Sequence, residues 1–482
     1  MTALPPGFLD QARVIVGEAD VLTDADAIAP YLVETRGLHQ GRAEAVFRPR
    51  STAEVAALAR LAHGAGVPFL AIGGNTGLVG GGVPFGGIVI SLARLNHIRA
   101  VDPANATMTL EAGVILQNVQ DAARKAGFLF PLSLGSEGSC TIGGNISTNA
   151  GGTGVLRYGN TRDLVLGLEV VMPDGAVLNG LGGLRKDNSG YDLKHLFIGS
   201  EGTLGIVTAA VVKLFPLPRS RVTAFAGASS VHKIVDLFER LRAVAGERLT
   251  TFEFLPRFGL ELVLRHAAKT RDPLSSAHLT YAMVELTSPE VDAPLEDLLA
   301  EVLETALEAE EIEDATIAAS EAQAGDFWRL RELLAECQKF EGGSIKHDVS
   351  VPISAVADFV AETSLACEAE MPGIRVCAFG HIGDGNIHFN LSQPVGMEKQ
   401  AFLAQWHHFN TLVHDAVHAR GGSIAAEHGV GLNKRDELLA YKDPVALALM
   451  VRIKQALDPQ NLLNPGKVVR IGNDLPMFTP GN

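Results

Sequence analysis

Glycine is concentrated in long segments of the first half of the chain, and this clustering limits the nucleotide-binding folds that the chain can adopt. The first segment spans 73–82, between apolar runs at 68–72 and 87–92 that are each typical of a β-strand. Before them, the apolar spacing predicts a helix over 52–65. A Rossmann fold instead requires Gly-x-Gly-x-x-Gly at the start of a helix. The chain contains neither that hexapeptide nor a Gly-Lys-Ser/Thr phosphate loop, so an NAD site of the Rossmann type is not expected.

A second segment rich in glycine and hydroxyl side chains spans 134–152, and the stretch 199–207 has a similar composition. Backbone without side chains allows successive N–H groups to approach an anion. Two such segments therefore predict a long, phosphate-bearing cofactor that lies between them. Residues 164–172 and 176–178 are joined by Pro-Asp-Gly, which predicts a β-hairpin.

Two histidines flank a glycine turn in the second half of the chain. His381 and His388 enclose Ile-Gly-Asp-Gly-Asn-Ile, with apolar residues before and after. This pattern predicts a strand, a tight turn and a second strand, which would bring the two imidazoles to one side. Asp384 and Asn386 are expected to stabilise the turn through their own side chains.

His381, His388 and Glu427 are candidate ligands of a divalent metal. Two neutral imidazoles and one carboxylate leave coordination positions open for a substrate. Zinc suits such ligands, and manganese, iron and cobalt tolerate them as well. His428 is the candidate general base, because an imidazole exchanges protons near neutral pH. On these residues alone, a metal-dependent hydrolase is also open.

Length, charge and cysteine content narrow the class of protein. A chain of 482 residues is expected to form about three domains. Its net charge of −15 argues against nucleic acid or an anionic membrane as a partner. The four cysteines are scattered without a Cys-x-x-Cys pair, as is usual in a reducing compartment. Because no signal peptide or membrane-spanning apolar run is evident, we expect a cytoplasmic protein without an integral membrane segment.

The second half of the chain alternates long helices with short strands. This pattern is typical of helices packed on an antiparallel sheet, so an α+β domain is expected. The expected helices span 231–244, 294–310, 324–340 and 353–370. The expected strands span 252–255, 279–286 and 345–351.

Several of these segments resemble the FAD domain of the vanillyl-alcohol-oxidase (PCMH) type. They are most similar to the branch that oxidises D-2-hydroxy acids, which includes D-2-hydroxyglutarate dehydrogenase and the flavin-dependent D-lactate dehydrogenases. The resemblance covers nearly the whole chain and is carried by 73–82, 131–159, 185–192 and 199–207. It implies an α+β fold in three parts. These are a two-subdomain FAD-binding domain over 1–220, an α+β substrate-binding cap with an antiparallel sheet over 221–422, and a C-terminal helical segment over 423–482 that returns to the flavin.

The resemblance also implies which residues hold the cofactor. Some relatives attach the flavin covalently through a histidine of the first glycine segment, but this chain has Asn75 there, so noncovalent FAD is expected. In the tail, the resemblance places Asn464 near the flavin ring. The full set implied to line FAD is Gly74, Asn75, Thr76, Gly77, Ser136, Thr141, Gly144, Ser147, Gly151, Ile206, Val207 and Asn464.

The substrate is expected to be an acid with a second carboxylate. D-2-hydroxyglutarate dehydrogenases have Arg and Lys at the positions of Arg331 and Lys346, where they would receive the acid groups. Asn390 and His381 are further candidate substrate contacts. One departure is Ala335, where the resemblance predicts threonine one helical turn after the arginine.

The expected activity is oxidation of a D-2-hydroxy acid to the 2-oxo acid by FAD with metal assistance. The stretch Ala-Ala-Glu-His-Gly-Val-Gly at 425–431 favours D-2-hydroxyglutarate over D-lactate or another small acid. More distant alternatives are a flavin-dependent ether-lipid synthase and a non-catalytic flavin subunit of an electron-transfer complex. Electron-transferring flavoprotein, a quinone or a cytochrome would reoxidise the flavin, and the expected oligomer is a homodimer.

Overall fold

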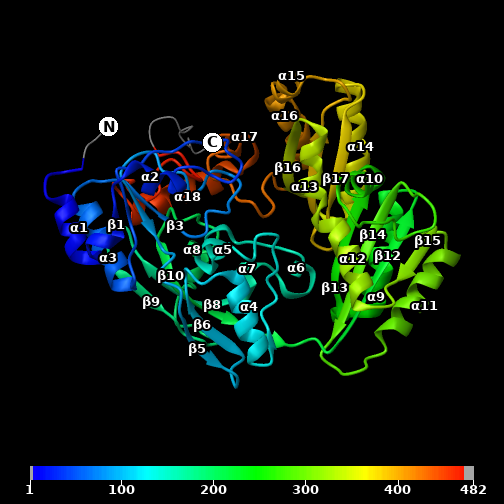
Figure 1. Ribbon diagram of the computed structural model, residues 1–482, viewed down its shortest axis with the longest axis horizontal. Coiled ribbons are helices and arrows are strands. Elements are labelled where there is room, and N and C mark those ends of the chain that lie inside the picture. The colour runs from blue at the N-terminus through cyan, green and yellow to red at the C-terminus, as the bar shows by residue number, and fades with distance from the viewer. Residues whose placement is uncertain (1–3, 472–482) are drawn as a thin grey trace, which may run out of the picture. The chain divides into compact units, whose positions relative to one another are not determined.

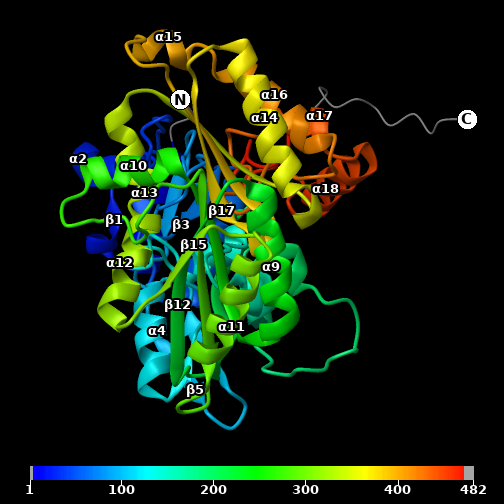
Figure 2. The same cartoon turned by 90° about the vertical axis from the view of Figure 1, so that its right-hand side faces the viewer.

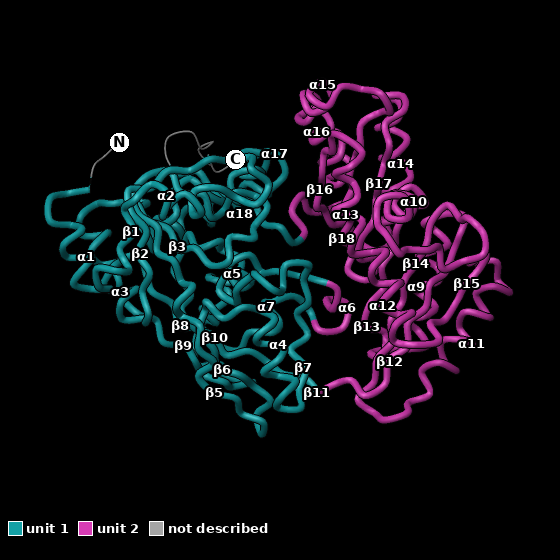
Figure 3. The backbone as a smooth tube through the Cα atoms, in the orientation of Figure 1, with its two compact units in different colours: residues 1–152, 159–216, 427–482 teal, residues 153–158, 217–426 magenta. Residues whose placement is uncertain are grey.

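The chain folds into two compact units (Figure 3). Unit 1 comprises 1–152, 159–216 and 427–482, and unit 2 comprises 153–158 and 217–426. This computed structural model describes residues 4–471. Within that part of the chain, no helix is both long and apolar enough to cross a bilayer.

The N-terminal part of unit 1 is a four-stranded sheet in the order β1-β2-β4-β3 (Figure 1). Strands β2, β4 and β3 are parallel, and β1 is antiparallel to β2. Helix α3 packs its apolar face on this sheet, and the predicted helix and strands of this region are confirmed. The elements are β1 (Val21–Leu22), β2 (Ala45–Phe47), α3 (Thr52–Gly64), β3 (Phe69–Ile72) and β4 (Ile88–Ser91).

The second sheet of unit 1 is antiparallel, with the order β5-β6-β10-β8-β9. Strands β8 and β9 form the predicted hairpin, in which Val171 pairs with Val177. Strand β10 is buried along almost its whole length, as expected for a central strand. The strands are β5 (Ile98–Asp102), β6 (Thr107–Glu111), β8 (Val165–Val171), β9 (Val177–Gly180) and β10 (Ile206–Lys213).

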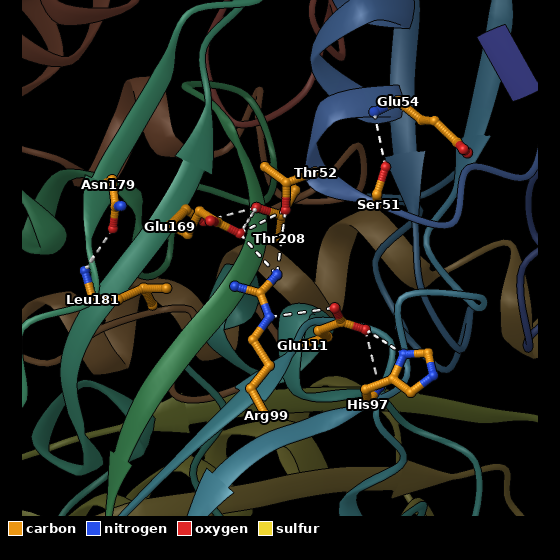
Figure 4. Close-up of polar contacts among 10 residues, drawn as sticks. All are labelled: Ser51, Thr52, Glu54, His97, Arg99, Glu111, Glu169, Asn179, Leu181 and Thr208. Atoms are coloured by element: carbon orange, nitrogen blue, oxygen red, sulfur yellow. Dashed lines mark hydrogen bonds and ion pairs between the residues drawn. The ribbon is translucent and has the colours of Figure 1, made fainter.

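A partly buried polar network joins helix α3 to the second sheet of unit 1 (Figure 4). The Arg99 guanidinium donates to Glu111 at 3.3 Å and to Glu169 at 3.1 Å. Glu169 also accepts from Thr52 at 2.6 Å and from Thr208 at 3.0 Å. Because Thr52 begins α3 whereas the other four residues lie on the second sheet, the network ties the two subdomains together.

The C-terminal segment of unit 1 returns to the first sheet. Helix α18 (Pro444–Leu457) precedes an extended stretch in which Leu462 O accepts from Phe69 N at 2.8 Å and Asn464 N donates to Phe69 O at 2.7 Å. Buried Lys454 donates to Thr203 O at 2.8 Å and to Asp458 at 2.6 Å. The tail is therefore fixed against β3 and against the third glycine-rich stretch.

Unit 2 is built on a seven-stranded antiparallel sheet in the order β15-β12-β14-β13-β17-β18-β16. Helices α9 (Val231–Ala245) and α11 (Leu295–Glu308) cover one face, and α10 (Arg257–His266) and α12 (Glu321–Glu332) cover the other (Figure 2). The strands are β12 (Ser220–Ala228), β13 (Leu249–Pro256), β14 (Thr280–Ser288), β15 (Asp314–Ile317), β16 (Ser344–Ser350), β17 (Arg375–His381) and β18 (Asn386–Ser392). The α+β fold class with an antiparallel cap sheet is confirmed.

Two helices of unit 2 differ in extent from the prediction. The helix expected over 324–340 is broken: α12 is followed by the short helix α13 (Leu334–Cys337) and a 3-10 turn at Gln338–Glu341. The helix expected over 353–370 starts with a 3-10 turn, so α14 spans Val356–Glu370. In the first case the turn of chain brings Gln338, whose side chain is fully buried, into the core.

The predicted histidine hairpin is formed by β17, a 3-10 turn at Ile382–Asp384, and β18. Asp384 accepts from Asn386 N at 3.0 Å, as expected of an Asx turn. The rings of His381 and His388 lie on the same side with their centroids 5.7 Å apart. The hairpin thus brings the two imidazoles to one side, as predicted, because His381 pairs with Asn386 and Asn386 shares a face with His388.

Candidate active site

The two main glycine-rich segments of unit 1 lie against each other. A Cβ atom added at Gly73 would lie 2.3 Å from Thr141 Oγ1, and one at Gly74 would lie 2.2 Å from Ser139 O. Such distances are shorter than van der Waals contact, so only glycine allows the two backbones to approach this closely. The sequence indicated this close approach through the glycine residues present in both segments.

The predicted FAD residues occur around this approach. Asn75 has a left-handed backbone (φ 52°) and donates through Nδ2 to Val33 O at 2.8 Å. Ser136 O accepts from Ser139 N at 2.9 Å, which closes the second segment into a turn. Ser147 Oγ donates to Gly143 O at 2.7 Å, one turn earlier in the same helix.

Two buried polar atoms next to the glycine contact have no hydrogen-bond partner within residues 4–471. They are Thr141 Oγ1 and Asn145 Oδ1, on residues that are each 5% exposed. Buried polar atoms are nearly always satisfied, so these two suit a ligand that supplies partners. The glycine approach and the Thr141 hydroxyl, which can donate to a phosphate oxygen, fit a phosphate-bearing cofactor such as FAD, whereas Asn145 Oδ1 needs an N–H or O–H donor of that cofactor.

The third glycine-rich stretch and the tail join the same region of unit 1. Glu201 N donates to Ser147 O at 2.7 Å, and β10 then carries the buried residues Ile206 and Val207. Asn464 is 3% exposed, and its Nδ2 donates to Gly81 O at 3.1 Å and Glu201 O at 2.9 Å. The tail residue predicted to lie near the flavin therefore links the first and third glycine-rich stretches.

Glu201 is a functional candidate that the sequence did not single out. Its carboxylate accepts from Val430 N at 2.7 Å and from Gly431 N at 2.9 Å, directly after the Glu427-His428 pair. Burial raises the pKa of Glu201 to about 7, although these two amides oppose the shift. Neighbouring Lys467, also buried, has a pKa lowered to about 8. The motif Gly-Ser-Glu-Gly gave no sign of this role, because the partners are distant in sequence.

In unit 2, strand register places four of the predicted residues on one face of the sheet, namely Lys346, His381, His388 and Asn390. Glu253 pairs with His381, and His381 pairs with Asn386. In the next row His388 pairs with Asp348 of β16. Cross-strand neighbours of one face have Cβ atoms about 5 Å apart. Cross-strand pairing therefore explains why Glu253, His381 and His388, which are distant in sequence, lie close together.

The candidate substrate residues Lys346 and Asn390 are directly opposite each other in the β16–β18 register. Lys346 Nζ donates to Ala335 O at 3.4 Å, and Asn390 Nδ2 donates to Gln338 Oε1 at 2.8 Å. The segment after α12 therefore contacts both residues. Gln338 was not predicted, since its role depends on the break between α12 and α13.

Arg331 and His381, the other two candidate substrate residues, both contact the buried carboxylate of Glu253. Arg331 Nε donates to Glu253 at 2.7 Å, and the other oxygen of Glu253 contacts His381 Nδ1. The guanidinium also lies over the ring of Phe379, 4.8 Å from its centroid. Burial alone would raise the pKa of Glu253, but its interactions with the His381 ring and the Arg331 guanidinium hold it below the ordinary value.

Two side chains with metal-ligand chemistry lie together in unit 2. Asp348 Oδ1 is 3.8 Å from His388 Nδ1 on the neighbouring strand. In the sequence, Glu427 and His428 follow directly on Ala426, whose amide donates to Asp348 O at 3.4 Å. Carboxylate and imidazole side chains of this kind fit a divalent transition metal.

Asp348 was not in the predicted ligand set of His381, His388 and Glu427, and that set stays a prediction. Asp348 Oδ1 lies 3.8 Å from His388 Nδ1 and accepts from Asn386 Nδ2 at 2.9 Å, so it is placed to orient that imidazole. Strand alternation from Lys346 was the available signal for Asp348. The roles of His381 as ligand and His428 as base stay predictions.

Comparison with known proteins assigns the family. Residues 217–468 match the family described as FAD linked oxidases, C-terminal domain, and residues 43–180 match the FAD binding domain. The chain belongs to the FAD-linked oxidases. The predicted family and the predicted FAD cofactor are thereby confirmed.

Relatives of this FAD-linked oxidase include two proteins named for one substrate. It is 40% identical to the probable mitochondrial D-2-hydroxyglutarate dehydrogenase of Oryza sativa subsp. indica, over 95% of this chain and 80% of that protein. It is 41% identical to D-2-hydroxyglutarate dehydrogenase of Xanthomonas citri pv. viticola, over 90% of this chain and 91% of that protein.

The fold of this oxidase is shared with more distant flavoproteins. The structure of p-cresol methylhydroxylase with substrate bound superposes with a TM-score of 0.74 at 17% identity, covering 98% of this chain and 99% of that one. At this identity the likeness shows the fold alone.

Replacing Gly74 by alanine tests the cofactor cradle of the oxidase. The new Cβ would lie 2.2 Å from Ser139 O, so the two segments would have to separate. We expect at least about tenfold weaker FAD binding, equivalent to about 1.4 kcal/mol. FAD affinity of the apoprotein is measured by fluorescence quenching. Gly135→Ala is the control, because nothing lies within 4 Å of its added Cβ. Equal FAD affinity of Gly74→Ala and wild type would contradict the cradle.

The raised pKa of Glu201 predicts a pH-dependent stability. Since the folded pKa of about 7 lies above the ordinary 4.5, the stabilisation is present below the ordinary value and is lost as pH rises through 7. The loss amounts to at most about 3 kcal/mol. We expect the Tm of the FAD-loaded protein to fall between about pH 5 and pH 8, and to fall less in Glu201→Gln.

Glu169→Gln is the control for this measurement. Burial opposes the shift, but hydrogen bonds from Thr52, Arg99 and Thr208 hold the pKa of Glu169 below its ordinary value. A carboxyl group whose folded pKa is lowered loses its stabilisation only at more acid pH. The Glu169→Gln variant should therefore keep the drop in Tm between about pH 5 and pH 8. An unchanged drop in Glu201→Gln would show that another group causes it.

Proposed function

We propose that this protein oxidises D-2-hydroxyglutarate to the corresponding 2-oxo acid. The proposal is carried by one observation, together with the names of the relatives: Lys346 and Asn390 are neighbours on the unit 2 sheet, and Arg331 of helix α12 is bonded to Glu253 of the same sheet. Two cations and an amide suit an acid that has a carboxylate at each end. Bound FAD supplies the two-electron acceptor.

In this proposal the residues of the chain divide the work between binding and proton transfer. His381, His388 and Glu427 would hold a divalent metal, with zinc the first choice, which supplies a Lewis acid for the C1 carboxylate and the 2-hydroxyl. Arg331 and Lys346 bind the distal carboxylate. His428 accepts the proton of the 2-hydroxyl while C2 is oxidised.

D-Lactate is the second candidate substrate, favoured by Ala335. In place of the threonine that the family resemblance predicts, alanine removes a hydroxyl from the segment that contacts Lys346. A small acid would not need that hydroxyl. The proposed reoxidant is electron-transferring flavoprotein, a quinone or a cytochrome, and the proposed assembly is a homodimer.

Anaerobic titration of the metal-loaded flavoprotein tests the substrate. D-2-Hydroxyglutarate should bleach the visible flavin absorbance, and the L-enantiomer should not. A charge-assisted bond to the second carboxylate contributes about 1.5–3 kcal/mol, so kcat/KM should exceed that for D-lactate by about 10–100-fold. Lys346→Met should remove much of this preference and leave D-lactate turnover unchanged. Bleaching by D-lactate alone would favour the second candidate, and bleaching by neither acid would contradict both.

Replacing His428 by alanine tests the proton acceptor. General-base catalysis is typically worth about 10²–10⁴-fold, so kcat should fall by that factor. FAD content should stay at the wild-type value, because His428 is not among the residues assigned to the cofactor. The measurement is steady-state turnover with an artificial electron acceptor beside the absorbance spectrum. Wild-type turnover in this variant would exclude the assignment.

A further inference from the structure

Glu253 is the most completely buried carboxylate of the candidate site, with a side-chain exposure of 0%. It lies on β13, directly opposite His381 of β17 in the strand register. One of its oxygen atoms accepts from Arg331 Nε at 2.7 Å, and the other contacts His381 Nδ1. A single carboxylate is thus bonded to two residues that the proposed mechanism uses for different tasks.

The bond to Glu253 selects one tautomer of His381. A carboxylate accepts hydrogen bonds and cannot donate them when ionised, so His381 Nδ1 must carry the proton. The lone pair of the neutral ring is then on Nε2, which is the arrangement needed for a metal ligand. Metal-binding histidines usually have such a carboxylate or carbonyl partner on the second nitrogen.

The same carboxylate limits the orientation of Arg331. The bond uses Nε and not the two terminal nitrogens, and the guanidinium lies over Phe379 at 4.8 Å from the ring centroid. Two contacts on a planar group define its plane, so the terminal nitrogens have a set direction for a carboxylate. The Arg331 side chain is 12% exposed, and the His381 side chain is 10% exposed.

We propose that Glu253 is a positioning residue that orients His381 for the metal and Arg331 for the distal carboxylate of the substrate. This inference rests on the proposed function. It connects metal binding and substrate recognition through one side chain that touches neither ligand. A merely structural ion pair would stabilise the unit 2 core without affecting either property.

The Glu253→Gln variant distinguishes a positioning role from a merely structural ion pair. The variant keeps the volume of the side chain but replaces one acceptor oxygen by an NH₂ donor, so one of the two bonds must be lost or reversed. If the amide donates to His381 Nδ1, the proton moves to Nε2 and the ring cannot bind a metal through it. The matched control is Glu285→Gln on neighbouring β14, where a buried carboxylate accepts from Trp328 Nε1 of the same helix α12 at 3.1 Å.

Zinc affinity of the purified flavoprotein, measured by competition with a chromophoric chelator, is the first readout and needs no substrate. We expect Glu253→Gln to bind zinc about 10–100-fold more weakly, as for other partners of metal-binding histidines, whereas Glu285→Gln stays near wild type. The second readout is steady-state kinetics at saturating zinc, in which KM for D-2-hydroxyglutarate should rise more than kcat falls. Glu253→Asp keeps the charge and should recover part of the zinc affinity.

The outcomes are distinct. Zinc affinity and KM in Glu253→Gln that match wild type would overturn the proposal, and so would equal losses in Glu253→Gln and Glu285→Gln. If Glu253→Gln does not fold, the same comparison between Glu253→Asp and the matched Glu285→Asp decides. Wild-type protein that binds zinc but does not oxidise D-2-hydroxyglutarate would contradict the proposed function, while the zinc readout would still test Glu253.

Discussion

The register of four antiparallel strands in unit 2 is the constraint on which the candidate site depends. Strands β13, β17, β18 and β16 align Glu253, His381 and Asn386 in one row and His388 and Asp348 in the next. A slip of one residue in any pair would turn a whole set of side chains to the opposite face. The backbone ladder thus determines which side chains can share a metal or a substrate.

Two buried carboxylates show different ways of keeping a charge in a protein interior. Glu253 is compensated by a guanidinium and an imidazole, so its pKa lies below the ordinary value. Glu201 is held mainly by two backbone amides, which do not offset burial, and its pKa rises to about 7. Ionised groups without a counter-charge are costly to bury, so the difference in partners accounts for the opposite directions.

The fold alone does not define the chemistry of this oxidase. The protein named p-cresol methylhydroxylase shares its architecture at 17% identity, whereas the relatives near 40% identity are named for a hydroxy acid. Within one fold, individual side chains determine the chemistry, and Arg331, Lys346 and His388 are the candidates in this chain. Gln338 reaches Asn390 only through the break after α12.

Local signals in the sequence were enough to predict the hairpin about His381 and His388, the helix after Ser51 and the glycine-rich cradle. The hairpin depends on alternation, the helix on capping, and the cradle on the lack of side chains, and all three are properties of residues close together in the sequence. The family resemblance added Asn464 and the basic residues. The contacts of Glu253 with Arg331 and His381, of Glu201 with Val430 and Gly431, and of Asp348 with His388 were decided only by the tertiary structure. They join residues far apart in the chain, and their distances and pKa values follow from strand register and burial, which no local pattern contains.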